Sequence, residues 1–300
     1  TPLYSSAASD VYKRQIVSIA SGKGGTGKTT VAVNLALSLA SNADAPKILF
    51  LDCDVEEPNA HLFLNPTITE REVVNILIPH VDETLCAHHG RCTQVCQFHA
   101  IAALPDTTLV FPELCHGCGS CTLACPEQAI SEHPHQLGII EAGRAGQIRF
   151  AHGILNVGEP MATPIIRRLK QRIDESYDLA ILDAPPGTAC PVVESMRGAD
   201  YVLMVTEPTP FGLHDLRLAV QVARDELRLP VGVVVNQDGI GDKGVDEYCS
   251  SEGIPILMRI PLDRRIAEAY SEGITIVEAL PEYRERFAEL MERIKTGVLT

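Results

Sequence analysis

The sequence predicts an α/β fold with a doubly wound, mostly parallel β-sheet. Two observations carry this prediction: short apolar runs rich in Val, Ile and Leu alternate with stretches of helical periodicity, and the runs lack the polar face of a half-exposed strand. The runs expected to be strands are Ile16–Ala20, Ile48–Leu51, Leu179–Leu182, Tyr201–Val205, Val231–Val235 and Ile256–Ile260. Helices are expected at Thr30–Ala40, Ala162–Glu175, Leu213–Leu227 and Val245–Glu252. Such an alternation places ligands at the carboxyl ends of the strands.

Composition limits the possible partners. The chain has 300 residues, 45% of them hydrophobic, and a formal net charge of −14. It can therefore bury a core of one or two domains, and its acidity argues against nucleic acid or an anionic membrane as partner. No run approaches the ~20 apolar residues of a membrane span, and no secretory signal is visible. We expect a cytoplasmic protein without stable membrane insertion, in which residues 1–14 are a disordered or extraneous leader.

A glycine-rich motif follows the first expected strand. Residues 22–29 read Gly-Lys-Gly-Gly-Thr-Gly-Lys-Thr and match the phosphate-loop pattern G-x-x-x-x-G-K-[ST]. In such a loop, backbone N–H groups surround the phosphates, the lysine reaches the β- and γ-phosphates, and the final hydroxyl binds Mg²⁺. A glycine-rich turn without ligand is the alternative, which the strand before and the helix after disfavour. The expected nucleotide-binding residues are Gly22, Gly24, Gly25, Thr26, Gly27, Lys28, Thr29 and Thr30.

Residues 81–132 interrupt the alternation and hold seven of the ten cysteines. The second half of this stretch reads Cys115-x2-Cys118-x2-Cys121-x3-Cys125-Pro126, the ligand run of bacterial two-cluster ferredoxins. Structural zinc is the alternative, but zinc does not need a third cysteine so close. With no export signal, metal or redox chemistry is a better explanation of these cysteines than disulfides.

The first half of the stretch repeats the pattern with one exchange. It reads Cys86-x2-His89-x2-Cys92-x3-Cys96, with His89 where a cysteine is expected. The histidine could ligate, leave a three-iron cluster beside it, or mark an empty site, and His88 could ligate instead. An imidazole in place of a thiolate raises the cluster potential.

The stretch resembles an inserted, small α+β ferredoxin-like module. The resemblance implies that the fourth cysteine of each run serves the other cluster. One cluster would then use Cys96, Cys115, Cys118 and Cys121, and the other Cys86, Cys92, Cys125 and His89. The implied cofactors are one or two [4Fe-4S] clusters, the second possible as [3Fe-4S] or with a histidine ligand.

Lys23, directly after the first glycine of the motif, extends the resemblance. The string K-G-G-x-G-K-[ST] is similar to the deviant phosphate loop of MinD/ParA-type ATPases. This resemblance implies that Lys23 reaches across an ATP-bound homodimer to the partner's nucleotide, where its charge would assist phosphoryl transfer. A solvated surface lysine is the alternative. The implied domains are the ATPase at 15–80 and 133–300 and the ferredoxin-type insert at 81–132.

The same resemblance assigns roles at other strand ends. Asp54 would orient or activate the attacking water, Asp52 would support Mg²⁺ or its waters, and Asp183 would hold Mg²⁺ through water. Gly187, in a loop similar to the second switch of Mrp-type iron–sulfur carriers, would donate to the γ-phosphate. Helix caps and solvated loops are the alternatives for such acids.

Three further features of the sequence give weaker predictions. Asn236 and Pro261 correspond to residues that flank adenine in relatives, although asparagine also starts turns. Cys190 follows Asp183 at the same offset as a cluster-bridging cysteine in the nitrogenase iron protein. The alternative is that Cys190 is a small buried thiol. The amphipathic stretch Tyr283–Lys295 carries acidic residues, so we expect it to pack on the sheet rather than bind lipid.

Three hypotheses for function result. The first is a Mg²⁺-dependent ATPase whose nucleotide state controls dimer closure and thereby electron transfer through, or handling of, iron–sulfur clusters. The second is an iron–sulfur scaffold or carrier that delivers clusters to apo-proteins. The third, a membrane- or DNA-positioning ATPase, is disfavoured by the acidic charge. Neither the redox partner nor the acceptor protein can be identified from the sequence.

Overall fold

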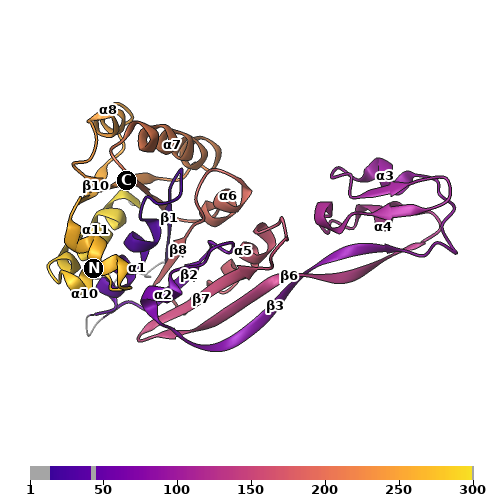
Figure 1. Cartoon of the computed structure of the whole chain (residues 1–300), viewed down its shortest axis with the longest axis horizontal. Coiled ribbons are helices and arrows are strands. Elements are labelled where there is room, and N and C mark those ends of the chain that lie inside the picture. Colours follow the sequence, from indigo (N-terminus) through magenta and orange to yellow (C-terminus); the bar gives the residue numbers. More distant parts are fainter. Residues whose placement is uncertain (1–13, 42–44, 299–300) are drawn as a thin grey trace, which may run out of the picture.

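The computed structural model describes residues 14–41 and 45–298, and residues 1–13 of the expected leader lie outside this range. Its main feature is a nine-stranded sheet of order β11-β10-β9-β1-β8-β2-β7-β6-β3 (Figure 1). Every pairing in this sheet is parallel except the two that β6 makes. The strands are β1 (Gln15–Ala20), β2 (Ile48–Asp52), β3 (Thr67–Val81), β6 (Ile130–Ala145), β7 (Ile148–Leu155), β8 (Leu179–Asp183), β9 (Tyr201–Thr206), β10 (Val231–Asp238) and β11 (Ile256–Pro261). The expectation of a mostly parallel α/β sheet is confirmed.

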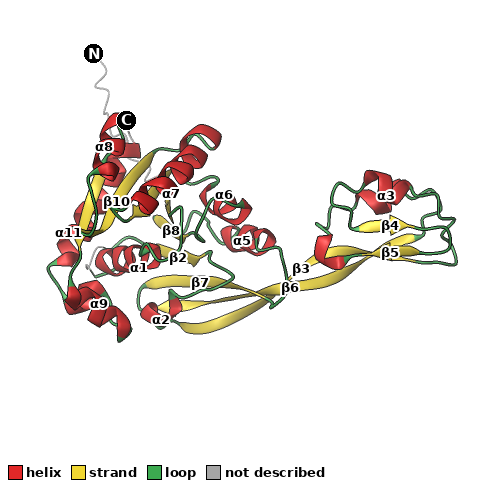
Figure 2. Ribbon diagram, turned by 45° about the horizontal axis from the view of Figure 1, so that its top comes forward, coloured by secondary structure: helices red, strands yellow, loops and turns green. Residues whose placement is uncertain are grey.

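Helices cover both faces of the parallel strands (Figure 2). One face packs against α1 (Lys28–Leu39), α2 (His61–Leu64), α9 (Arg264–Ser271), α10 (Ile276–Ala279) and α11 (Tyr283–Val298). The other face packs against α5 (Thr163–Lys170), α6 (Cys190–Met196), α7 (Pro210–Gln221) and α8 (Gly244–Ser251). Alternate residues of β9 enter the two cores, with Leu203 on the first face and Val202 on the second. This two-sided burial explains why the central strands are apolar throughout.

The chain changes direction around β1. Its neighbours in the sheet are β8 and β9, so the chain crosses over β1 when it passes from one to the other. In open α/β sheets the crevice at such a point, outside the carboxyl ends of the strands, is where ligands bind. The glycine-rich loop follows β1 directly and therefore lies at this crevice.

Strands β3 and β6 extend beyond the sheet as a two-stranded arm (Figure 1). Next to the sheet, β6 also pairs with β7, from Gly138 to Ala145, but beyond Gly138 it pairs with β3 alone. A register shift between Val74 and Asn75 marks the point of departure, and such bulges bend and twist a strand pair. Neither strand is among those expected from the sequence. Both expected insert boundaries, 81 and 132, fall at the far end of the arm.

The far end of the arm carries the cysteine lobe, residues 82–129 (Figure 2). Its elements are α3 (Arg91–Val95), β4 (Ile101–Ala103), β5 (Thr108–Val110), a 3-10 turn (Pro112–Leu114) and α4 (Ser120–Ala124). Since β3 and β6 run without interruption from the main sheet to the lobe, no linker separates the lobe from the sheet. The expectation of a separate module is therefore not supported by the chain path.

The lobe and the tip of the arm have internal pseudo-symmetry. The constant offset that takes Cys86 to Cys115 also takes α3 to α4. The same offset takes Val81 to Val110 and Ile101 to Ile130, so the tip pair Val81–Ile130 of the arm corresponds to the β5–β4 pair Val110–Ile101. Each half is thus a strand, a cysteine loop, a short helix and a returning strand.

Two expected helices differ in extent. The helix expected at Ala162–Glu175 ends at Lys170, and Asp174 then accepts from the Ser176 N–H at 2.8 Å in a turn. Helix α7 begins earlier than expected because Thr209 caps it by accepting from the Gly212 N–H at 3.0 Å. The C-terminal stretch packs on the sheet as expected, with Phe287 and Ile294 fully buried.

Candidate functional site

The glycine-rich loop forms a tight turn between β1 and α1. Gly25 and Gly27 have φ angles of 77° and 90°, a region that side-chain-bearing residues rarely adopt. A Cβ at Gly27 would also lie 2.4 Å from Asn236 Nδ2. Lys28 begins α1 and is buried, and the Thr26 hydroxyl is buried without a hydrogen-bond partner among the described residues. A loop of this shape with an unpaired donor fits a phosphate ligand.

Two carboxylates meet beside this loop. Asp52 and Asp183 end β2 and β8 and are direct neighbours in the sheet, both fully buried. Burial raises the pKa of Asp183 to about 7, while the Thr29 hydroxyl and Lys28 oppose the rise. Within the described chain, neither carboxylate oxygen of Asp183 has a partner at hydrogen-bonding distance and angle. A buried, unpaired carboxylate next to the Thr29 hydroxyl has the donor set that suits Mg²⁺ or its waters.

Asp52 has a different role from Asp183. Its carboxylate accepts from the backbone N–H groups of Asp54, Asn59 and Ala60 at 3.1, 3.1 and 3.0 Å. Burial and the neighbouring Asp183 nevertheless raise its pKa well above the ordinary value. Asp52 therefore holds the loop after β2 in place. That loop carries Asp54, whose pKa burial raises to about 6 although Lys28 lowers it.

Several expected nucleotide contacts are used within the chain itself. Lys23 Nζ pairs with Glu207 Oε2 at 2.8 Å, so Lys23 points to the end of β9. The Gly187 N–H donates to Ser21 O at 3.0 Å, and Asn236 Nδ2 donates to Thr26 O at 2.8 Å. Pro261 ends β11 and is exposed. The sequence analysis missed Glu207, for which the only signal is its position one residue after a buried strand.

The cysteine lobe contains two hollows, and each draws on both halves of the repeat. The first hollow is lined by Cys96 together with Cys115, Cys118 and Cys121. The second is lined by Cys86, Cys92 and Cys125 together with His88 and His89. The fourth cysteine of each run thus lies with the first three positions of the other run, the same grouping that the ferredoxin resemblance implies.

Backbone N–H groups point at thiols in matching places of the two halves. Ala100 N–H lies 3.3 Å from Cys96 Sγ, and its counterpart Ala129 N–H lies 3.4 Å from Cys125 Sγ. Hydrogen bonds of this kind stabilise thiolates and tune cluster potentials. Burial raises the pKa of Cys115 and Cys121, whereas a hydrogen bond to Ser120 lowers that of the exposed Cys118.

The remaining cysteines lie outside the lobe. Cys53 and Cys249 are buried, and burial raises the pKa of both thiols. Cys190 is exposed at the start of α6, three residues after Gly187, so the alternative of a buried thiol is wrong for it. No helix in the ranges 14–41 and 45–298 is long and apolar enough to cross a membrane.

This geometry defines a nucleotide-binding protein of the phosphate-loop class. Residues 17–276 match the CobQ/CobB/MinD/ParA nucleotide binding domain, and the chain belongs to this family. The fold is shared with solved structures: the septum site-determining protein MinD of Pyrococcus horikoshii, complexed with Mg-ADP, is 20% identical with a TM-score of 0.59. The similarity covers 94% of this chain and 96% of that one.

The sequence of the chain is also similar to those of two individual proteins. The uncharacterized protein MJ0579 of Methanocaldococcus jannaschii is 31% identical over 86% of this chain and 90% of its own length. A protein of Pyrococcus horikoshii named iron-sulfur cluster carrier protein is 27% identical over 93% of this chain and 84% of its own length. The chain is therefore a MinD/ParA-family protein with a distant relationship to iron–sulfur cluster carriers.

Proposed function

We propose that this protein is a Mg²⁺-dependent ATPase whose nucleotide state controls electron transfer through, or handling of, iron–sulfur clusters in the cysteine lobe. The observation that carries the proposal is the pair of cysteine hollows held on strands of the same sheet that carries the phosphate loop. Nucleotide and cluster sites joined by continuous β-structure can influence each other's geometry.

The ATPase part assigns a role to each polar group at the carboxyl ends of the strands. Lys28 and the loop amides would bind the phosphates, and Thr29 and Asp183 would hold Mg²⁺, which neutralises the developing charge. Asp54, with its raised pKa, would orient or deprotonate the attacking water. Asp52 would keep the Asp54 loop in register through its three backbone hydrogen bonds.

Lys23 would reach the partner's nucleotide in an ATP-bound homodimer. In this protomer Lys23 pairs with Glu207, so dimer closure would require this pair to open. Asn236 would approach adenine from the end of β10, and Gly187 would exchange its bond to Ser21 for the γ-phosphate. These exchanges would make the loops sensitive to nucleotide state.

Cluster binding in the first hollow is supported against zinc by the spacing of its thiols. Thiolates sharing one zinc ion lie about 3.8 Å apart, since each Zn–S bond is about 2.3 Å. Among the described residues, only Glu83, Cys86 and His88 bring three ligand atoms within 4.8 Å of one another. No three thiols of the first hollow, all of whose cysteines lie in the described chain, are that close together, and this suits ligands that each bind a different iron of a cubane.

Helix α5 offers the physical route between the two sites. Its buried face, with Ile165 and Leu169, packs on Val55 of the loop after β2. A Cβ at Gly153 would lie 2.5 Å from Ile165 and 2.6 Å from Val55, so glycine permits this close contact. Movement of the Asp54 loop would therefore press on α5.

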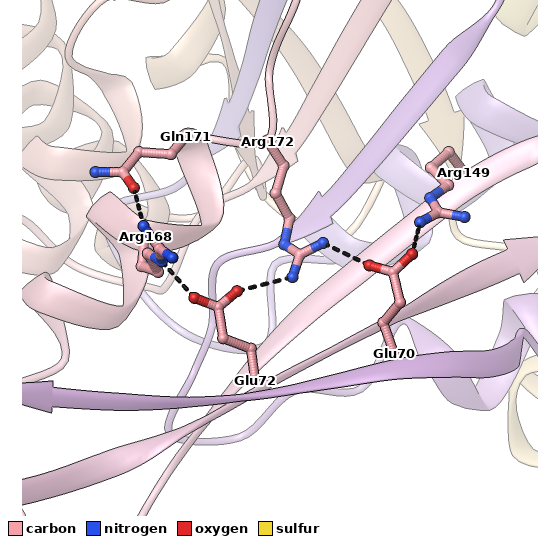
Figure 3. A network of polar contacts seen from close by, with 6 residues as sticks. All are labelled: Glu70, Glu72, Arg149, Arg168, Gln171 and Arg172. Atoms are coloured by element: carbon pink, nitrogen blue, oxygen red, sulfur yellow. Dashed lines mark hydrogen bonds and ion pairs between the residues drawn. The ribbon is translucent and has the colours of Figure 1, made fainter.

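The opposite end of the route is an ion-pair network that we call the arm clamp: Glu70, Glu72, Arg149, Arg168 and Arg172 (Figure 3). Arg172, just after α5, contacts Glu70 and Glu72 of β3 at 3.0 Å each, and Arg168 of α5 also pairs with Glu72. The clamp ties α5 to the base of the arm.

Helix α5 is also tied to the Gly187 loop through α6. Arg167 pairs with Glu194 at 3.1 Å, and Lys170 Nζ donates to the carbonyls of Glu194 and Arg197 at 2.5 Å. A shift of α6 would therefore be passed to α5 and, through the arm clamp, to the lobe.

The test is anaerobic purification with iron and sulfide counting, followed by electron paramagnetic resonance (EPR) with and without ATP and Mg²⁺. We expect at least about four irons per chain, about eight if both hollows hold cubanes, and a spectrum that changes with ATP. Lys28→Ala should keep the iron and lose the ATP response. Zinc in place of iron, or no ATP binding by the loaded protein, would overturn the proposal.

Cluster delivery is the second candidate function. The similarity to a named iron–sulfur cluster carrier favours it, and so does the exposure of Cys118, which would leave one corner of a cluster accessible. Anaerobic incubation with an apo-acceptor separates the two: a carrier loses its clusters to the acceptor, whereas an electron carrier keeps them through redox cycles.

A further inference from the structure

The second hollow differs from the first in the side chain that completes it. Three cysteines, Cys86, Cys92 and Cys125, line it, and the position equivalent to Cys118 is His89. The side chain of His89, however, pairs with Glu127 at the rim, with 3.5 Å between Nε2 and Oε1, and is 41% exposed. His89 therefore occupies the expected position in sequence but is engaged at the rim of the hollow.

The adjacent His88 is directed at a thiol instead. His88 Nδ1 lies 3.7 Å from Cys86 Sγ and 3.4 Å from the Thr108 hydroxyl, and its side chain is only 20% exposed. A nitrogen and a sulfur about 3.7 Å apart can bind the same metal atom, since the two bonds are about 2.0 and 2.3 Å long, so Cys86 and His88 would share one iron of the centre rather than bind two corners of a cubane.

The backbone holds His88 in this place by an unusual conformation. Its φ is 53°, close to the 63° of Gly117, which occupies the equivalent position in the other half. A histidine in the left-handed region is strained relative to glycine, and such strain gathers at functional sites. The Gly117 N–H faces Cys115 Sγ at 3.5 Å, so this position adjoins the first thiol in both halves.

A carboxylate completes the arrangement. His88 Nε2 lies 3.6 Å from Glu83 Oε2, and the other oxygen of Glu83 accepts from the Thr108 N–H at 2.8 Å. When a carboxylate accepts a hydrogen bond from the Nε2–H of a histidine, Nδ1 carries no proton and keeps its lone pair for a metal. This is the usual outer partner of a metal-binding imidazole.

We propose that His88, through Nδ1, is the non-thiolate ligand of an iron–sulfur centre in the second hollow, beside Cys86, Cys92 and Cys125, and that Glu83 is its positioning residue. The inference rests on the proposed function, because it requires that the lobe binds iron–sulfur clusters. It replaces His89, the ligand that sequence register suggests, with its neighbour.

The test is pulsed EPR of the full chain, loaded anaerobically with iron and sulfide and reduced. We expect a strongly coupled imidazole nitrogen in the wild type, its loss in His88→Ala, and its retention in the matched variant His89→Ala. His88→Cys should keep the iron content and lose the nitrogen signal. Glu83→Gln should change the nitrogen coupling, whereas Glu127→Gln, which faces His89, should not.

The contrary results are distinct. Loss of the coupling in His89→Ala but not in His88→Ala, or a second centre without any coupled nitrogen, overturns the assignment of His88. A wild-type protein with only about four irons, all in the first hollow, also overturns it but leaves the proposed function standing. A lobe that takes up no iron in any variant overturns both.

Discussion

Lys28 and Lys23 lie in one short loop but have different surroundings. Lys28 is buried at the start of α1 next to Asp183, whereas Lys23 is one-third exposed and paired with Glu207. The first environment favours a fixed role in phosphate binding. The second favours a residue that can leave its partner when another charge becomes available.

We therefore expect different losses from the two lysines. Lys28→Ala should weaken ATP binding at least about 100-fold, because the β- and γ-phosphates lose their cation. Lys23→Ala should leave binding nearly unchanged and lower the hydrolysis rate by about 100-fold or more. Isothermal titration measures ATP binding, and phosphate release measures the hydrolysis rate. Lys47→Ala, which alters an exposed residue at the opposite end of β2, is the control, and equal losses in all three variants would contradict the assignment.

Asp54 makes stability depend on pH. Its pKa is about 6 in the folded protein against an ordinary value of 3.8, so the folded state retains a proton that the unfolded chain releases between these values. Its contribution to stability is therefore greatest below pH 4 and falls as pH rises through 6. Asp54→Asn should remove this fall, so nucleotide-free urea unfolding should show the variant gaining on the wild type between pH 5 and 7.5. An unchanged difference would exclude a raised pKa for Asp54.

At the scale of elements, α5 and α11 illustrate two ways of joining the sheet. Helix α11 is held by apolar burial, with Phe287 and Ile294 fully enclosed, while Arg293 donates to the Leu257 carbonyl of edge strand β11 at 2.7 Å. Helix α5 is held by its apolar face and additionally by the arm clamp. The first arrangement stabilises the fold, and the second can transmit movement.

Phe287→Ala should destabilise the chain by about 3–5 kcal/mol, because it leaves a cavity in the largest core. Chemical denaturation of the nucleotide-free protein measures the change. Glu289→Ala, on the exposed face of the same helix, should change stability by less than about 0.5 kcal/mol. A similar loss in both variants would mean that α11 is stabilised by helix propensity rather than by packing.

Opening the arm clamp should separate the two activities. The double variant Glu70→Gln and Glu72→Gln should hydrolyse ATP within about twofold of the wild type. The residues of the arm clamp are distant from the phosphate loop along the chain, and the ion pairs of the clamp are partly exposed. It should lose the ATP-dependent change in hydrogen exchange along β3 and β6. Arg71→Gln, which removes the separate exposed pair with Glu141, is the control. A preserved ATP response in the double variant would exclude the α5 route.

For the whole molecule, the arm determines how the chain is divided. Val81 and Ile130 face each other as the last pair of the arm, so the lobe leaves and re-enters the sheet at one point. The ATPase fold can thus be closed without the lobe by a tight hairpin turn.

Replacing residues 82–129 with Asn-Gly should give a folded protein that binds ATP with wild-type affinity and holds no cluster iron. Circular dichroism, nucleotide titration and iron counting check the three points. Loss of ATP binding by the shortened chain would mean that the lobe is part of the ATPase fold rather than an attachment to it.

The sequence predicted the parts that depend on local pattern. The phosphate loop requires a fixed order of glycines and lysine, and the strands of the parallel sheet are apolar because both faces are buried. The arm strands were missed because β3 is largely exposed outside the sheet, so Thr67–Val81 contains charged residues and Pro79 and lacks a regular apolar alternation.

By itself, the sequence determined the family, the α/β class and which residue types can bind phosphate, Mg²⁺ and iron, because these follow from short-range order along the chain. Only the tertiary structure decided that Lys23 meets Glu207, that His88 rather than His89 faces Cys86, and that α5 contacts the Asp54 loop, α6 and the arm. These contacts join residues through side-chain direction and long-range packing, which no local pattern encodes.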